Sequence, residues 1–453
     1  MNPLGQAKES VFSQPENAPG PRTSSEGIPK ACQWLGARQS AAYFPAHAEA
    51  WSRRSLVITG SAIVSLLAGC SALPRARAVP PGDEADVTVL GLRDIRYWGD
   101  ETSPALIAEG KVAFDRELAA WRQSGHTGPL PPANYLAISG GSEDGAFGAG
   151  LLVGWTELGS RPQFKLATGI STGALTAPFA FLGPRYDPQL RRVFTETSAR
   201  SVLTGRGLLG FGILAALTGD ALYSNAPLRK TMGLFVTQAM LDDIADAYRQ
   251  GRVLLVGTTN LDEGRPVIWN IGKLAASGRP GILHLIHQIL IASAAIPGAF
   301  PPEMIDVEVD GRRYQEMHVD GGASAQVFVL PPSLQVNAEA TRRNISRVRH
   351  LYVIRNARRE PEFEETKRST FSIAARAISS LIQTQGVGDL YRIYIAASRD
   401  RMDFNLARIP ATFTMKLRRP FDQRYMQALY NVGYRLGRKG YPWARFPPGY
   451  QEL

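Results

Sequence analysis

The stretch FKLATGISTGALTAPFAFL, residues 164–182, decides the fold class. It begins with a short apolar segment typical of a buried β-strand, and it ends with an apolar segment that predicts a helix. Between them stands Gly169-Ile-Ser171-Thr-Gly173. Glycine on both sides allows a tight turn that exposes the Ser171 hydroxyl at the helix N-terminus, where the helix dipole favours developing negative charge. The stretch therefore predicts a strand, a sharp turn with a nucleophilic serine, and a helix.

The same rhythm of strand, turn and helix continues on both sides of this stretch. Buried strands are predicted at Tyr135–Ser139, Phe164–Thr168, Val253–Thr259 and Leu351–Arg355, and helices at 147–158 and 173–182. An earlier helix should begin at the capping pair Ser103-Pro104 and reach about Arg122. Short apolar strands that alternate with helices indicate an α/β sheet with helices on both faces.

A glycine-rich loop, SGGSEDGAFGAG at residues 139–150, follows the first of these strands. Such a loop presents backbone N–H groups outward, which suits an oxyanion or a phosphate. It lacks the Lys-Ser/Thr ending of a P-loop, and it does not match the dinucleotide-binding fingerprint. A turn that merely allows close packing is the alternative for this loop taken alone.

An aspartate followed by two glycines, Asp320-Gly321-Gly322, occurs further along the chain. An aspartate in this setting can sit on a tight loop with its carboxylate directed into a cavity. A plain turn is the alternative, and it is the commoner structure for an isolated Asp-Gly pair.

The three motifs in this order resemble the patatin-like phospholipases. In that family a glycine-rich oxyanion loop comes first, Gly-x-Ser-x-Gly second, and Asp-Gly-Gly or Asp-Gly-Ala third. The resemblance spans about Tyr135 to Leu330. Further similar stretches are Ser224–Leu228, Ile291–Pro297, Phe300–Pro302, Gly388–Arg392 and Phe421–Tyr425.

The resemblance implies a three-layer sandwich with a central, mostly parallel sheet. It also implies a serine acyl hydrolase of phospholipase A or lysophospholipase type, without cofactor or metal. Ser171 would be the nucleophile and Asp320 its proton acceptor, in a dyad without histidine. The oxyanion hole would be formed around Gly140, Gly141, Ser142 and Gly145, with Gly169 and Gly173 flanking the nucleophile.

One position departs from the family pattern. Many members carry a third glycine and then a lysine or arginine in the oxyanion loop, whereas this chain has Ser142 and Asp144 there. An acid cannot supply the same positive potential to a phosphate. The departure puts the headgroup preference in doubt more than the hydrolytic chemistry.

The N-terminal segment predicts targeting rather than folded structure. Residues 1–50 are rich in Gly, Pro, Ser, Ala and Gln, and Arg53-Arg54 precedes the apolar run 56–68, which is typical of a secretory signal. The following Leu-Ala-Gly-Cys70 resembles a bacterial lipobox, which implies lipidation of Cys70 and anchoring in the cell envelope, at the outer membrane. The paired arginines also resemble a twin-arginine export signal.

These observations predict three parts. They are a disordered extension with a signal peptide (1–69), a lipidated cysteine with its tether (70–86), and a single hydrolase domain (87–453). The domain would have a motif core at 135–330 and a helical completion at 331–453.

Composition excludes several classes of protein. The 453 residues include 44% hydrophobic and 20% charged residues, which is the range of globular proteins. Two cysteines exclude a disulfide framework. The net charge of +11 favours anionic surfaces, and an exported protein without a basic-aromatic platform is not expected to bind nucleic acid.

Two other functions stay open from the sequence alone. An ordinary α/β-hydrolase would need a histidine after the acid, and His350 is the candidate. A catalytically silent lipid-binding lipoprotein is conceivable because of Asp144. Gly207–Gly219 and the basic stretch Arg342–Arg359 are candidate lipid contacts, with a buried helix and a solvated face as the respective alternatives.

Overall fold

The computed structural model describes residues 73–202, 221–330, 334–343, 345–358, 363 and 365–450. The chain divides into two units, Met1–Leu67 and Ala68–Leu453, and all the described residues lie in the second. The predicted signal segment, Cys70 and the whole of Gly207–Gly219 therefore lie outside the described residues.

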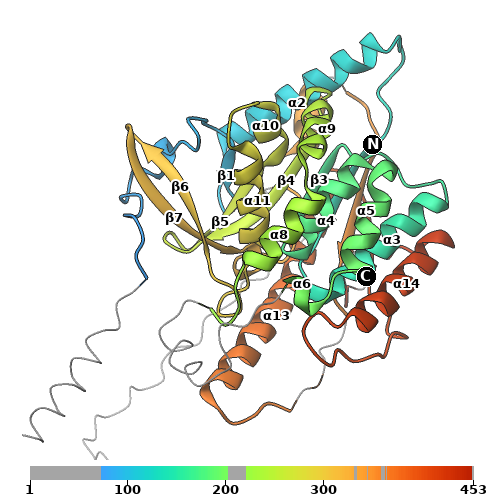
Figure 1. The fold of residues 1–453 in the computed structure, drawn as a ribbon. Helices are drawn as coiled ribbons and strands as arrows, with labels where there is room; N and C mark the ends of the chain where they lie inside the picture. Colours follow the sequence, from blue (N-terminus) through green and yellow to red (C-terminus); the bar gives the residue numbers. More distant parts are fainter. Residues whose placement is uncertain are drawn as a thin grey trace, which may run out of the picture. The chain divides into compact units, whose positions relative to one another are not determined.

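A mixed sheet forms the centre of the second unit (Figure 1). Its strands are β1 (Arg96–Trp98), β2 (Ala133–Ile138), β3 (Leu166–Ile170), β4 (Val253–Asn260), β5 (Arg265–Asn270), β6 (Glu303–Val309), β7 (Arg312–Asp320), β8 (Arg349–Arg355) and β9 (Asp403–Arg408). The spatial order is β1-β5-β4-β3-β2-β8-β9, and β7 joins β4 and carries β6. The five strands from β4 to β9 in this order are mutually parallel. Neighbouring parallel strands place their carboxyl ends at one edge, which is where α/β proteins build sites.

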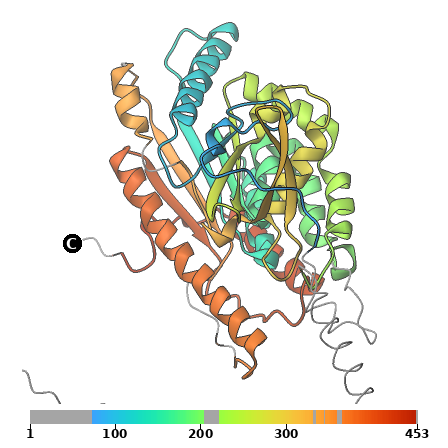
Figure 2. The same cartoon turned by 90° about the vertical axis from the view of Figure 1, so that its left-hand side faces the viewer.

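Helices cover both faces of this sheet. The longer ones are α2 (Pro104–Gln123), α3 (Gly145–Glu157), α4 (Thr172–Leu182), α5 (Asp187–Thr195), α8 (Ala226–Phe235), α9 (Gln238–Arg249), α11 (Ile282–Ser293), α13 (Thr370–Arg399) and α14 (Gln423–Arg438). Shorter ones are α6 (Ala199–Val202), α10 (Ile271–Ala276) and α12 (Val336–Arg342). In Figure 2 the cyan α2 and the orange α12 and α13 lie on one side, and the green and yellow helices lie on the other.

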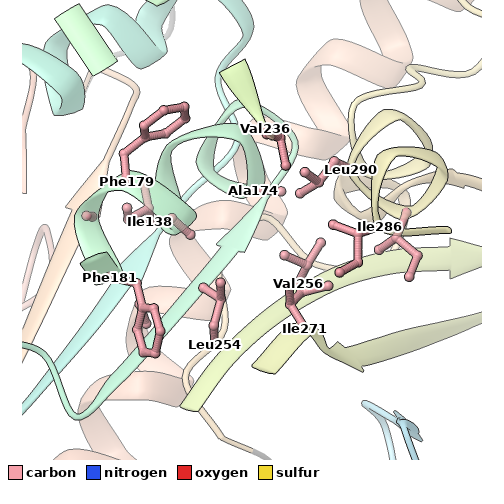
Figure 3. Close-up of a cluster of buried hydrophobic side chains, with 14 of the residues drawn as sticks. Ile138, Ala174, Phe179, Phe181, Val236, Leu254, Val256, Ile271, Ile286 and Leu290 are labelled. Carbon is pink, nitrogen blue, oxygen red and sulfur yellow. The ribbon is translucent and has the colours of Figure 1, made fainter. Parts of the chain in front are cut away.

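Two apolar cores follow from this layering. Successive strand residues alternate between them, so that Leu254 belongs to the core beneath α4 and α11, and Leu255 to the core beneath α2 and α13. Figure 3 shows the first core, where Phe179 and Phe181 of α4 lie over the sheet. Strands buried on both faces read as continuous apolar runs, which is why the sequence pattern found them. The predicted α/β class, with helices on both faces, is confirmed.

The predicted helix at Ser103-Pro104 is also confirmed. It runs from Pro104 to Gln123, and the Ser103 side chain accepts a hydrogen bond from the N–H of Leu106.

The C-terminal part differs from the expected helical completion. Besides α12, α13 and α14 it contributes β8 and β9 to the sheet. The apolar run 351–355 had indicated β8. The strand β9 escaped notice because it includes Asn405, which is buried and whose side-chain amide donates to the carbonyl of Leu351.

The expected tether also differs from a free linker in its described part. The Arg75 guanidinium binds the Asp262 carboxylate at 2.7 Å and 2.9 Å. Gln315 of β7 accepts from the N–H of Ala76 through its side chain and donates its own N–H to the carbonyl of Arg77, each at 2.9 Å. These contacts place residues 75–77 against the body.

Candidate active site

Ser171 lies at the sharp turn between β3 and α4. Its backbone has φ 54° and ψ −126°, a region that costs an L-residue free energy and that is common at functional sites. A Cβ on Gly173 would lie 2.2 Å from the carbonyl oxygen of Ile138, and one on Gly169 would lie 2.3 Å from that of Gly173. Only glycine fits at either position, so the two glycines allow the turn that presents Ser171.

Ser293, at the end of α11, holds this turn in place through hydrogen bonds of its hydroxyl group. Its hydroxyl accepts a hydrogen bond from the N–H of Ser171 at 3.0 Å and donates to the carbonyl of Gly257 at 2.6 Å. The turn is thereby tied to β4. No single residue pattern pointed to Ser293, although it lies within the family-like stretch Ile291–Pro297.

Asp320 reaches Ser171 because two strands meet end to end. The last residue of β3, Ile170, is opposite Gly257 of β4, and Asp320, the last residue of β7, is opposite Thr258. The strands β3 and β7 thus follow one another along one edge of β4, in opposite directions. Their carboxyl ends bring Ser171 and Asp320 together.

The surroundings of Asp320 make it a stronger base than an aspartate in water. The residue is 5% exposed. Burial raises its pKa to about 7, although hydrogen bonds with the Ser171 side chain and the Gly322 N–H favour the ionised form. A base with a pKa near the working pH is efficient in proton transfer.

The two glycines after Asp320 are also required by close approach. A Cβ on Gly321 would lie 2.6 Å from the carbonyl oxygen of Gly257. A Cβ on Gly322 would lie 2.9 Å from Oδ1 of Asp320, and that oxygen accepts from the Gly322 N–H at 2.7 Å. The motif is therefore a fixed turn around the carboxylate.

The glycine-rich loop lies directly beside the nucleophile. A Cβ on Gly140 would be 3.1 Å from that of Ser171. The Gly140 N–H donates to the carbonyl of Gln326 at 3.1 Å, and the Gly145 N–H donates to the carbonyls of Ser142 and Glu143. Among the described residues, the N–H groups of Gly141 and Ser142 have no partner, so these two are the candidate oxyanion donors.

Asn356, directly after β8, holds this loop in place. Its backbone N–H donates to the Ser139 hydroxyl at 2.9 Å and its side chain donates to the Ser139 carbonyl at 3.0 Å. The Gly148 N–H donates to the same amide at 3.1 Å. A Cβ on Gly141, which has φ 154°, would lie 2.2 Å from the Asn356 carbonyl oxygen. Asn356 was not among the predicted site residues, although a polar residue directly after a buried strand could have indicated it.

Gln326 links the loop to the aspartate turn. Its carbonyl accepts from Gly140, and its side-chain amide donates to the carbonyl of Gly322 at 3.2 Å. Its own N–H donates to the Asp389 carboxylate of α13 at 2.7 Å. Neither the type of this residue nor its spacing from the motifs had indicated this role.

Asp144 lines a cavity of about 750 Å³ beside the loop, together with Gly140 and Gly141. The Tyr425 hydroxyl donates to its carboxylate at 2.5 Å. Basic side chains from other elements line the same cavity: Arg355, Arg358, Arg376 and Lys416. Positive charge therefore reaches this cavity from β8, α13 and the segment before α14 rather than from the loop.

The histidines lie away from Ser171 or are bound within the core. His350 is the second residue of β8, where it pairs with Asn134, while Ile354 pairs with Ile138 near the other end. Its Nδ1 lies 2.9 Å from the Asp403 carboxylate. Because the strands are parallel, His350 lies at the edge of the sheet opposite to Ser171, and the dyad arrangement is the one that the geometry favours.

His318 is fully buried on β7, two residues before Asp320. Its Nδ1 lies 3.0 Å from the Thr258 hydroxyl and its Nε2 lies 3.0 Å from Glu316. Burial lowers the pKa of this histidine, so it is neutral and structural. His287 binds the Val236 carbonyl, and the described part of the chain holds no group of three or more potential metal ligands.

Much of the basic stretch Arg342–Arg359 is paired within the protein. Arg343 binds Asp115, Arg347 binds Glu117, and Arg342 binds Glu339.

None of the helices within the described residues has the length and apolar character required to cross a membrane.

Comparison with known proteins gives one family match. Residues 136–332 match the model of the family described as patatin-like phospholipase. Among solved structures, VipD from Legionella pneumophila is similar at 12% identity and a TM-score of 0.34, over 68% of this chain and 66% of that one. Human GIVD cytosolic phospholipase A2 is similar at 13% identity and a TM-score of 0.31, over 58% and 48% respectively. The chain spans about two thirds of the first and about half of the second. No curated protein matches it.

Proposed function

Starting from the family to which residues 136–332 belong, the patatin-like phospholipases, we propose that the chain is a serine acyl hydrolase that cleaves carboxylic esters of lipids. The observation that supports this most directly is the meeting of a strained Ser171 with a buried Asp320 whose pKa is raised to about 7. The substrate would be a phospholipid or lysophospholipid.

The reaction follows from these positions. The Ser171 hydroxyl oxygen attacks the ester carbonyl carbon while its proton passes to the Asp320 carboxylate. The developing oxyanion receives hydrogen bonds from the N–H groups of Gly141 and Ser142, a type of contact worth about 3 to 4 kcal/mol per donor. The leaving alcohol takes the proton from Asp320, and an acyl ester remains on Ser171. Water then attacks this ester and gives a proton to Asp320. Asp320 returns this proton to the Ser171 oxygen as the bond to the acyl carbon breaks, which releases the acid and restores the serine.

A fluorophosphonate probe tests the assignment. Wild-type protein should be labelled on Ser171 and should hydrolyse a soluble short-chain ester, whereas Ser171→Ala should do neither. Asp320→Asn should lose several orders of magnitude in turnover, because an amide cannot accept the serine proton. His350→Ala is the matched control and should keep most of the activity. Undiminished hydrolysis by Ser171→Ala would reject the nucleophile, and an inactive, folded His350→Ala would favour a triad.

We also propose that the chain is anchored to the cell envelope through a lipid on Cys70, at the outer membrane. The support is the signal-like sequence before Cys70. Since Arg75 is bound to Asp262, the five residues after Cys70 would span at most roughly 18 Å. The anchor would then hold the β6–β7 side of the body close to the membrane.

A further inference from the structure

A second cavity, of about 270 Å³, lies at the edge of the sheet opposite to Ser171. Its floor is formed where the parallel strands begin, at Tyr135 of β2 and at Leu166 of β3, which are paired in register. Leu166 precedes Ser171 by five residues on the same strand and turn. At about 3.3 Å per residue this distance is roughly 17 Å, so the cavity is separate from the catalytic site.

The walls of this cavity are mainly apolar. They come from α2, from the sheet, and from the segment that leads into α12: Leu106, Phe114, Leu166, Leu255, Leu334 and Val336. Charged side chains, both basic and acidic, line it as well, and Arg349, at the start of β8, is one of the basic ones. The acids of the lining, Glu109, Glu117 and Glu339, are each paired with a basic side chain. An apolar cavity with a polar group that can orient a ligand is a common form of a small-molecule site.

Arg349 differs from the other cations around the cavity. Lys165 and Arg347 both bind Glu117, at 2.7 Å and 2.6 Å, and Arg343 binds Asp115 at 2.7 Å. Arg349 is 7% exposed, and within the described residues its guanidinium has one hydrogen bond, at 3.4 Å, to the Asn337 amide oxygen.

Within the described residues no carboxylate forms an ion pair with Arg349, and Asp400, which also binds Asn337, is paired with another arginine. Asp400 accepts from the backbone N–H of Asn337 at 3.0 Å, and it is paired with Arg399 at 2.6 Å. A guanidinium stays charged in a protein, and a buried charge without a counter-ion is costly. A carboxylate is the anion that matches its planar donors in a bidentate manner.

We propose that this cavity binds a single-chain fatty acid, with the carboxylate on Arg349 and the chain along the apolar walls from α2 and the sheet. This inference goes beyond the proposed function and stands without it. If the hydrolase activity is also real, its product belongs to the same chemical class, and the cavity would sense that product at a distance from Ser171.

Calorimetric titration of the full chain with dodecanoate tests the proposal. Wild-type protein should bind it saturably, and Arg349→Gln should weaken binding about tenfold to a hundredfold, the factor for a charge-assisted hydrogen bond. Arg342→Gln is the matched control, because Arg342 lines the same cavity but its side chain is 69% exposed and bound to Glu339. Its affinity should match that of the wild type.

A second variant and two other ligands test the proposal even if Arg349→Gln does not fold. Val336→Trp should fill the cavity and abolish binding without touching the cation. Dodecanol should bind at least tenfold more weakly than dodecanoate. A dodecanoyl lysophospholipid, which lacks the carboxylate, should not compete when it is added to Ser171→Ala protein, in which hydrolysis cannot release dodecanoate. Binding at the catalytic centre instead would be insensitive to both variants, and that result, or no saturable binding at all, would overturn the proposal.

Discussion

Because the pKa of Asp320 is raised, we expect both the free energy of unfolding and the activity to depend on pH in a measurable way. Its pKa moves from 3.8 to about 7 in the folded protein, chiefly by burial. The native state therefore binds this proton more tightly than the unfolded chain does. The free energy of unfolding should decrease as the pH rises from about 4 to about 7, because the ionised form of a buried, unpaired carboxylate is disfavoured. Three pKa units at 1.36 kcal/mol each give about 4 kcal/mol as the full effect.

Asp320→Asn isolates this contribution, since asparagine does not titrate and other groups cancel in the difference. Urea unfolding of wild type and variant should show the variant gaining up to about 4 kcal/mol on the wild type between about pH 4 and about pH 7. Fluorophosphonate labelling of the wild type should rise over the same range, with half of the maximal rate near pH 7. A stability difference independent of pH would exclude the raised pKa, because it would mean that Asp320 ionises at its ordinary pKa.

Three further predictions concern the loop, the core and the anchor. Asn356→Ala should lower kcat on a soluble ester about tenfold to a hundredfold with little change in KM, as the oxyanion donors lose their support; an unchanged kcat would contradict this. Glu316→Gln should lower the free energy of unfolding by about 3 to 5 kcal/mol, because it leaves the Arg96 charge buried without its partner; an unchanged urea midpoint would exclude that role. Cys70→Ser should abolish incorporation of labelled palmitate in cells while soluble-ester hydrolysis persists, and equal incorporation in both proteins would reject the anchor.

The sequence predicted the elements that obey a simple apolar rhythm. The strands β2, β3, β4 and β8 are buried on both faces and appear as apolar runs, and Ser103-Pro104 capped α2 as expected. The hairpin of β6 and β7 was missed because its exposed polar residues interrupt the apolar pattern. That hairpin carries Asp320, so the sequence identified the aspartate as a motif without showing how it reaches Ser171.

The residues that position the site were the hardest to foresee. Ser293, Gln326 and Asn356 act through a few hydrogen bonds each, mostly to loop backbone, and each lies far along the chain from the group that it holds. Side-chain type and local spacing carry no information about such partners. Glycines are easier to predict, because the residue type itself indicates a tight turn or a close approach. Gly141 and Gly173 were predicted in this way, and the structure shows which carbonyl groups approach them.

Two carboxylates on β7 have pKa values that are shifted in opposite directions. Glu316 and Asp320 are both buried, at 2% and 5% exposure. Burial alone would raise both pKa values, but a hydrogen bond from His318 and the charge of Arg96 hold the pKa of Glu316 at about 2. No cation is among the causes that act on Asp320, and its pKa is about 7. The charge of Arg96 therefore keeps Glu316 ionised, in a structural role. Asp320 has no such cation beside it and can accept and return a proton near neutral pH.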